Sequence, residues 1–235
     1  MPVSKNRALE NHSMSKLFSG AMGCLSGVTT VWWLGCHNFE EALLVRRLFP
    51  DLKRVVAADP LLSDRGLLRA RNILRGCEVI GIRKAVASRE VYESCGGRAK
   101  FNVTSNGGAS SSMLPVGKAH REHFPTVRET GQSDVETIHL GDFPGPIADA
   151  LITDIQGSEY DVFKGNRDVI DQIGFIYAEV CFDYLYDGQG LFQNIVDLLA
   201  DKFTLVGMIP DHATFGNALW EAMEMPGLRL DDGEG

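Results

Sequence analysis

Short apolar runs that end at a glycine or an acid alternate along this chain with stretches of helical spacing. Two such runs are residues 31–35 and 54–59, and each has the pattern of a buried parallel strand that leads into a ligand-facing turn. Between them, apolar positions three and four residues apart predict a helix over 39–49, which Pro50 ends. The repeated strand–helix order predicts an α/β fold with a mostly parallel sheet and helices on its faces.

The remaining elements follow from the same patterns. A helix is expected over 63–75, with Ser63 as its N-cap and Gly76 as its stop. The last two strands, 203–209 and 212–220, are expected to form an antiparallel hairpin through a tight turn at Pro210-Asp211. The other expected strands are 77–87, 100–103, 135–140, 147–153 and 175–180, and the other expected helices are 13–19, 158–170 and 189–200.

These elements are expected to form one domain, residues 31–224. Residues 1–30 are expected to form an N-terminal arm, and the acidic, glycine-rich residues 225–235 a disordered tail. Within the domain, residues 88–146 are rich in Ser, Gly and Thr. We expect a mobile loop between the two strands of that segment, because a long stretch without regular structure is usually functional or disordered.

Composition narrows the class of protein. The 235 residues are 44% hydrophobic and 23% charged, a balance typical of a globular domain. The formal net charge of −8 disfavours nucleic acid as a partner, because an acidic surface repels phosphates. No apolar run approaches the roughly 18 residues of a membrane span. The five cysteines form no C-x-x-C pair and are expected as free thiols, which favours the cytoplasm. The sequence does not indicate the oligomeric state.

The candidate functional residues are expected where strands end, since ligands of open α/β sheets bind at the carboxyl ends of the strands. Gly35 allows a tight turn close to a ligand. Asp59 ends the next strand, where nucleotide sites place an acid on the ribose hydroxyls. The loop between 34 and 39 lacks the G-x-G-x-x-G of dinucleotide enzymes, which argues against NAD. A glycine and an acid that serve only their own turns remain an alternative.

Two further acids end later strands. Asp154 follows an apolar strand, where a carboxylate would bind an ammonium group or take a proton from a hydroxyl. Glu179 ends the next strand, so the two are expected to face one cleft. The alternatives are a helix N-terminal acid for Asp154 and a solvated side chain for Glu179. His37 is the histidine best placed for catalysis, because it lies in the candidate cofactor loop.

Residues 154–165 carry a longer motif. They read D-I-Q-G-S-E-Y-D-V-F-K-G, which resembles the D-[VI]-[EQ]-G-x-E-x-x-[VL]-[LF]-K-G signature of FkbM-family methyltransferases. The strand I-Y-A-E-V at 176–180 and the run L-Y-D-G-Q at 185–189 are similar to the segments that follow this signature in the family. Upstream, A-D-P at 58–60, A-V-A-S at 85–88 and S-S-S-M at 110–113 resemble its remaining segments.

The resemblance implies a class I methyltransferase fold, a Rossmann-like seven-stranded sheet with an antiparallel last strand. It also implies S-adenosylmethionine (SAM) as methyl donor and O-methylation of a hydroxyl on a small molecule or glycan. By position, Asp154 is the candidate base, with Glu179 or His37 in support. The residues that the resemblance assigns to SAM are Gly35, Cys36, His37, Asn38, Asp59, Pro60, Ala87, Ser88, Asp154 and Gln156.

The first loop departs from the family pattern. Cys36 replaces an alanine, Phe39 replaces the second glycine, and Trp33 stands where an acid often lies. These departures motivate an alternative, a non-catalytic binding protein of the same fold. A nucleotide-dependent oxidoreductase is a third hypothesis, which the missing glycine fingerprint disfavours. No cluster of His, Cys and Asp has the spacing of metal ligands, so no metal is expected.

Overall fold

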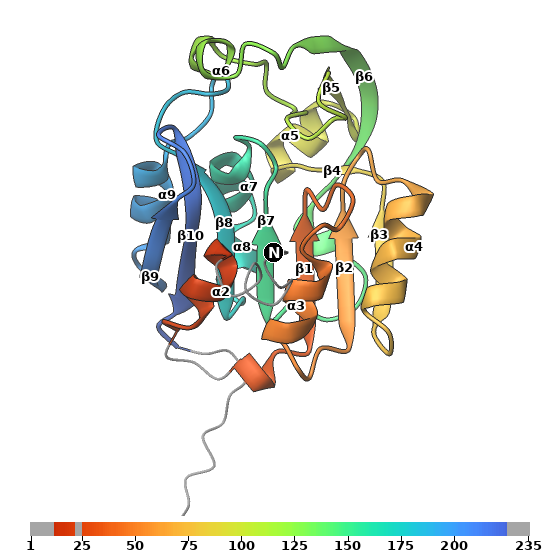
Figure 1. Ribbon diagram of the computed structural model, residues 1–235, viewed down its shortest axis with the longest axis vertical. Helices are drawn as coiled ribbons and strands as arrows, with labels where there is room; N and C mark the ends of the chain where they lie inside the picture. The colour runs from red at the N-terminus through yellow and green to blue at the C-terminus, as the bar shows by residue number, and fades with distance from the viewer. Residues whose placement is uncertain (1–11, 22–24, 225–235) are drawn as a thin grey trace, which may run out of the picture.

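A seven-stranded sheet forms the centre of the molecule (Figure 1). The computed structural model describes residues 12–21 and 25–224. The strand order is β3-β2-β1-β7-β8-β10-β9, and β10 runs antiparallel to both of its neighbours, which confirms the expected fold class. The strands are β1 (Thr30–Leu34), β2 (Arg54–Ala58), β3 (Glu78–Ile82), β7 (Ala150–Thr153), β8 (Phe175–Cys181), β9 (Phe203–Pro210) and β10 (Phe215–Ala222).

Helices pack on both faces of this sheet. Side chains alternate along a buried strand, so the neighbours Trp32 and Trp33 enter different apolar clusters on opposite faces. The cluster with Trp33 includes side chains of α2 (Ser13–Phe18), α3 (Ala42–Leu48) and α4 (Asp64–Ile73). The cluster with Trp32 includes side chains of α7 (Glu159–Gly165), α8 (Arg167–Ile170) and α9 (Phe192–Leu199). The result is a three-layer α/β/α domain.

A second, smaller sheet lies beyond the carboxyl ends of the central strands (Figure 1). It consists of β4 (Ala85–Val86), β5 (Arg98–Thr104) and β6 (Glu129–Ile138), and it is accompanied by α5 (Arg89–Ser94) and α6 (Lys118–His123). A loop does connect β5 and β6, as expected, and it contains α6. Polar side chains of β5 and of this loop bond to the backbone: Asn102 Nδ2 donates to the carbonyl of Ser112, and Ser111 Oγ accepts from the N–H of Thr104.

The strand expected over 77–87 is two strands. β3 ends at Ile82, and β4 leaves the central sheet to pair with β6, with Val86 opposite Ile138. Apolar periodicity does not distinguish one long strand from two short strands in different sheets, because both are apolar. The break carries the residues after Val86 into the small sheet's layer.

The helix expected over 158–170 is broken at Asn166. This side chain is fully buried: its Nδ2 donates to the carbonyls of Ala87 and Val162, and its Oδ1 accepts from the N–H of Leu140. The amide of Asn166 therefore joins the end of α7 to the residue that follows β4 and to Leu140. The hairpin also differs from expectation, because β9 extends through Pro210 and the connection to Phe215 runs over residues 211–214.

The described residues bear on two further expectations. Across 12–21 and 25–224, no helix is both long enough and apolar enough to cross a bilayer. Cys36, Cys77, Cys95 and Cys181 are free thiols. Cys24, the first residues of the expected arm and the expected tail 225–235 lie outside the described residues.

Candidate functional site

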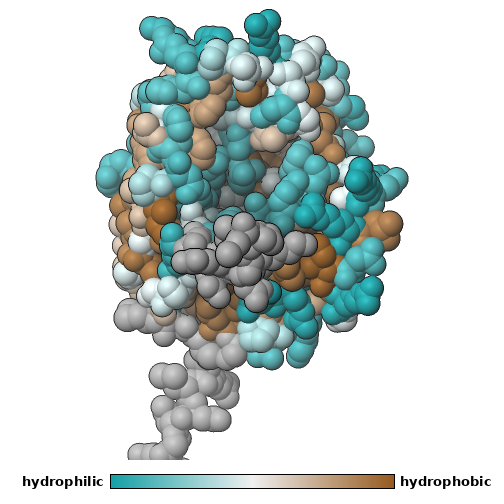
Figure 2. Space-filling view, in the orientation of Figure 1, coloured by the Kyte–Doolittle hydropathy of each residue, from teal (hydrophilic) through white to brown (hydrophobic). Residues whose placement is uncertain are grey.

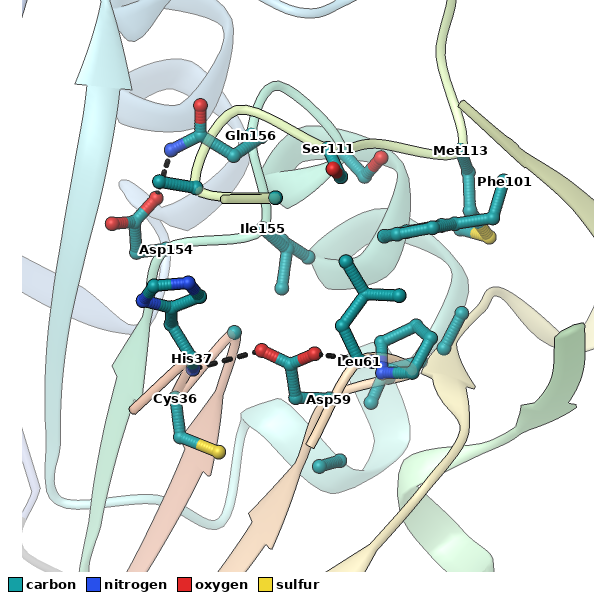
Figure 3. A pocket seen from close by; sticks show the side chains of 18 of the residues that line it. Cys36, His37, Asp59, Leu61, Phe101, Ser111, Met113, Asp154, Ile155 and Gln156 are labelled. Atoms are coloured by element: carbon teal, nitrogen blue, oxygen red, sulfur yellow. Dashed lines mark hydrogen bonds between the residues drawn. The ribbon is translucent and has the colours of Figure 1, made fainter. Parts of the chain in front are cut away.

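A cavity of about 340 Å³ opens where the small sheet faces the carboxyl ends of β1, β2 and β7. The molecular surface is hollowed on this side (Figure 2). Figure 3 shows a polar end with His37 and Asp154 and an apolar end with Leu61, Phe101 and Met113. The predicted residues that line it are Gly35, Cys36, His37, Asp59, Pro60, Asp154 and Gln156.

Gly35 lies where two loops cross. Its φ of +70° is in the left-handed region, and a Cβ added there would collide with the carbonyl oxygen of Asp154. Asp154 in turn donates its N–H to the carbonyl of Leu34, at 3.0 Å. Only a glycine permits this close approach between β1 and β7, so Gly35 serves chain packing as well as the turn at the cavity.

The loop after Gly35 is strained but leaves the cavity open. His37 and Phe39 have φ values of +41° and +55°, which are uncommon for residues with a side chain. The ring of Phe39 is fully buried in the core and packs edge-on against Trp33, with ring centroids 5.3 Å apart. Phe39 thus takes a conformation that suits glycine, and its side chain points away from the ligand space. These positive φ values also explain why α3 begins at Ala42 and not at residue 39.

Asp59 is held in one orientation by the backbone. Its Oδ2 accepts from the N–H of His37 at 2.8 Å, and its Oδ1 accepts from the N–H of Leu61 at 2.7 Å (Figure 3). Burial raises the pKa of this carboxyl, and the two hydrogen bonds oppose that rise. Each carboxylate oxygen retains a lone pair, so Asp59 can accept two further hydrogen bonds from a ligand.

Asp154 and Glu179 share one amide. Gln156 Nε2 donates to Asp154 Oδ1 and also to Glu179 Oε2, the latter at 3.0 Å. Tyr186 donates its hydroxyl to Gln156 Oε1 at 2.6 Å, and Gln156 itself has a φ of +55°. The expectation that the two acids face one cleft therefore agrees with the geometry, and Gln156 is the side chain that sets their relative positions.

The pKa values of Asp154 and Glu179 are both raised. The side chain of Asp154 is exposed to the cavity, but the surrounding protein shields it from bulk water and raises its pKa to about 6. The pKa of Glu179 lies well above its ordinary value, because of burial and then the charges of Asp154 and Glu159. The negative charge of one carboxyl group thus disfavours ionisation of the other.

Glu159 fixes the loop that carries Asp154. Its carboxylate accepts from the N–H groups of Ile155 at 2.6 Å and Gly157 at 2.9 Å. Burial, and then the charge of Asp154, raise the pKa of Glu159 to about 7. Ser158, at the N-cap position of α7, makes no capping bond, and its buried Oγ has no partner among the described residues. Glu159 therefore fixes the loop before α7, and within the described part of the chain no side chain caps the helix itself.

Four predicted residues lie outside the lining of this cavity. Asn38 lies beside it and places its Nδ2 near the ring nitrogens of His37. Ala87 is buried, and Ser88 Oγ caps α5 by accepting from the N–H of Val91. Ala85 and Val86 line the cavity instead, because the chain has already turned into β4. Glu179 lines a second cavity, of about 200 Å³, which shares Gly35, Glu41 and Asp154 with the first.

Sequence reasoning missed several lining residues. Met113 and Ser111 come from the loop that was expected to be mobile, and Phe101 from the strand expected at 100–103. Tyr186 lies in the L-Y-D-G-Q run and Met113 in the S-S-S-M run, so the motif comparison contained a signal for both. No pattern in the sequence marked Phe101. Within the described ranges, no group of three or more His, Cys, Asp or Glu side chains is arranged to hold a metal ion.

The strand order is that of class I methyltransferases. Methyltransferase FkbM from Methylobacillus flagellatus KT superposes with a TM-score of 0.54 over 91% of this chain and 47% of that one, at 12% identity. The fibrillarin/Nop5p complex contains a chain that superposes with a TM-score of 0.50 over 88% and 78%, also at 12% identity. At this identity, the likeness concerns the fold.

The family follows from the sequence match. The model of the family described as "Methyltransferase FkbM domain" matches residues 37–203, well over half of the chain. The chain belongs to the FkbM methyltransferase family, as its motifs indicated. It is also similar to the 2-O-methyltransferase NoeI of Sinorhizobium fredii (strain NBRC 101917 / NGR234), at 32% identity over 123 residues. That match covers 48% of this chain and 50% of NoeI, so the chain spans about half the length of this curated relative.

Proposed function

We propose that the chain transfers a methyl group from SAM to a hydroxyl of a small molecule or glycan, with Asp154 as the base. The observation that carries this proposal is the place of Asp154, which lines both cavities at their junction. A donor in the first cavity and an acceptor in the second would meet at this carboxylate. The curated relative's name as a 2-O-methyltransferase supports oxygen as the atom that is methylated.

The first cavity suits SAM along its whole length. Asp59 offers two free lone pairs to the ribose hydroxyls, and Ser158 brings a buried hydroxyl that lacks a partner among the described residues. Leu61, Phe101 and Met113 form an apolar end suited to the adenine ring (Figure 3). These residues replace Ala87 and Ser88, which the resemblance assigned to SAM and which lie outside the lining. The polar end near Asp154 would take the methionine part of SAM.

Catalysis in this arrangement requires positioning and one proton transfer. When bound, SAM supplies a methyl group on a sulfonium, and its transfer to the acceptor oxygen leaves S-adenosylhomocysteine. Asp154 takes the proton of the acceptor hydroxyl and ends the reaction protonated. With a pKa of about 6, Asp154 is ionised at neutral pH and still basic enough to assist. Gln156 holds the carboxylate in place through its hydrogen bond, as a positioning residue.

The non-catalytic alternative loses its main argument. It rested on Phe39, whose ring was expected to narrow the approach of the backbone to the cofactor. The ring lies in the core and is absent from the cavity lining. His37 lines the first cavity and not the second, so it supports SAM binding better than it supports proton transfer.

Turnover by the Asp154→Asn variant tests the proposed base. Asparagine keeps the shape and cannot accept the proton, so methyl transfer from labelled SAM to a panel of polyhydroxy acceptors should fall by about 10²–10⁴-fold. Asp168→Asn, which changes an exposed carboxylate on α8, is the matched control and should retain full turnover. Near-normal turnover by Asp154→Asn would refute the assignment.

A further inference from the structure

The second cavity lies on the face of the sheet that carries α2 and α3. Met14 of α2, Tyr177 and Glu179 of β8, and Asn217 of β10 line it, together with residues shared with the SAM cavity. Asn217 is paired with Glu179 across β8 and β10, so both side chains are on one face of the sheet. With about 200 Å³, the cavity has room for a small ligand or for one part of a larger one.

The wall of this cavity is strongly acidic. Four carboxylates line it, and the described lining residues include no Lys or Arg. His12 is the basic side chain present, and its Nδ1 accepts from the N–H of Met14. The four carboxylates are those of Glu41, Asp154, Glu179 and Asp211.

The side chain of Tyr177 completes the wall. Tyr177 is only 5% exposed, and its ring stacks with Phe18 at a centroid distance of 6.2 Å. Tyr177 lines the cavity, and its hydroxyl forms no hydrogen bond with the described residues, so it is free to pair with a ligand. Tyr177 lines the same cavity as Asp211 and Glu41, whose charges add to burial in raising the pKa of its phenol.

These groups define the chemistry of a ligand. Ionised carboxylates only accept hydrogen bonds, so the ligand must bring donors. A neutral polyol would bring donors but no positive charge to offset the repulsion among the ionised carboxylates of the wall. An anion would increase that repulsion. A protonated amine supplies both the donors and the opposite charge.

We propose that this cavity binds the methyl acceptor, and that the acceptor carries a protonated amine beside the hydroxyl that is methylated. The inference rests on the proposed function. Glu179 and Asp211 line the second cavity but not the first, so the ammonium group binds there while the hydroxyl meets Asp154 at the junction. Asp211 is held for this role by Ser13 Oγ, which donates to Oδ1 at 2.7 Å, and by Asn217, which donates to Oδ2.

A matched pair of small probes tests the inference. Binding of 1,3-diaminopropan-2-ol and of glycerol to the full chain is measured by NMR titration in the presence of S-adenosylhomocysteine. The two probes differ only in two ammonium groups that replace two hydroxyls. We expect the diamine to bind at least about tenfold more tightly than glycerol, and Asp211→Asn to reduce this preference by about fivefold or more. Asp168→Asn should leave the preference unchanged.

Binding of SAM to the same variants separates this inference from the proposed function. Asp211→Asn should change the Kd for SAM by less than about twofold, because Asp211 does not line the first cavity. Glycerol that binds as tightly as the diamine would overturn the cationic acceptor. A parallel loss of SAM affinity in Asp211→Asn would overturn it too, since the acids would then serve the cofactor. Selective diamine binding without any SAM binding would instead refute the proposed function and leave the cation site in place.

Discussion

At the residue scale, the protonation of Asp154 connects the structure to activity. The carboxylate is the candidate base and lies among other acids, and shielding by the protein raises its pKa from 3.8 to about 6. A base acts only when it is deprotonated. Activity should therefore be lost as the pH falls through the pKa of Asp154.

The pH profile of kcat/KM should show this loss. We expect an acid limb with a midpoint near pH 6 and a plateau above about pH 7, because kcat/KM reports groups of the free enzyme. The measurement uses the best acceptor from the turnover panel and a buffer series of constant ionic strength. A profile that stays flat down to about pH 4.5 would mean that the essential group is not Asp154.

The sequence correctly predicted which residues line the cavity where those residues follow a strand of the central sheet. Gly35, Asp59 and Asp154 end adjacent strands, and the structure brings all three to one cavity. Ala87 and Ser88, which follow an expected strand and which the resemblance assigned to SAM, lie outside its lining. Prediction from a strand end requires a strand of the central sheet, but their strand, β4, pairs with β6.

At the scale of elements, the loop between β7 and α7 depends on Glu159. A glutamine has one acceptor oxygen, so Glu159→Gln would leave the N–H of Ile155 or of Gly157 without its partner. The substitution should lower the free energy of unfolding by about 1–3 kcal/mol. Chemical denaturation near pH 5 measures this loss.

The loss of stability in Glu159→Gln should also depend on pH. The pKa of Glu159 is raised from 4.5 to about 7 in the fold, so its stabilising contribution is full below about 4.5 and is lost as the pH rises through 7. The difference in stability between wild type and Glu159→Gln should therefore be smaller near pH 8 than near pH 5. An equal difference at both pH values would show that Glu159 is not buried as a neutral acid.

Elements were predictable where apolar periodicity is strong and much less so where polar side chains bond to the backbone. The helix at 63–75 was found as α4, with Ser63 capping it through the N–H of Gly66. The break at Asn166 and the order within 88–146 depend on hydrogen bonds to distant segments. A local pattern contains no information about such partners.

At the scale of the whole molecule, α2 belongs to the main apolar core. Phe18 is nearly fully buried and packs against Phe49, Phe175 and Tyr177. The boundary expected at residue 30 would instead make this helix part of a separate arm. Phe18→Ala should lower the free energy of unfolding by about 3–5 kcal/mol, the usual cost of such a cavity.

Denaturant unfolding measures this effect, with Leu68→Ala as control. Leu68 is 61% exposed on α4, and its truncation should change the stability by no more than about 0.5 kcal/mol. A similarly small effect of Phe18→Ala would indicate that α2 is a dispensable arm.

The topology of the molecule was predicted from the resemblance to the FkbM family and not from apolar periodicity. Alternating strands and helices predicted a parallel sheet, but the seven-stranded order depends on which strands meet after long connections. The motif at 154–165 supplied that order through the family. The acidic second cavity was not predicted, because its four carboxylates come from separate parts of the chain and only the fold brings them together.

Calorimetric titration of SAM into the purified chain and its Asp59→Ala variant tests the central claim most directly, since it needs no knowledge of the acceptor. We predict binding with a Kd in the micromolar range, about −8 kcal/mol, and a loss of at least about tenfold in Asp59→Ala, which removes the ribose acceptor. The absence of SAM binding to the wild-type chain, or equal binding to both, would contradict the account.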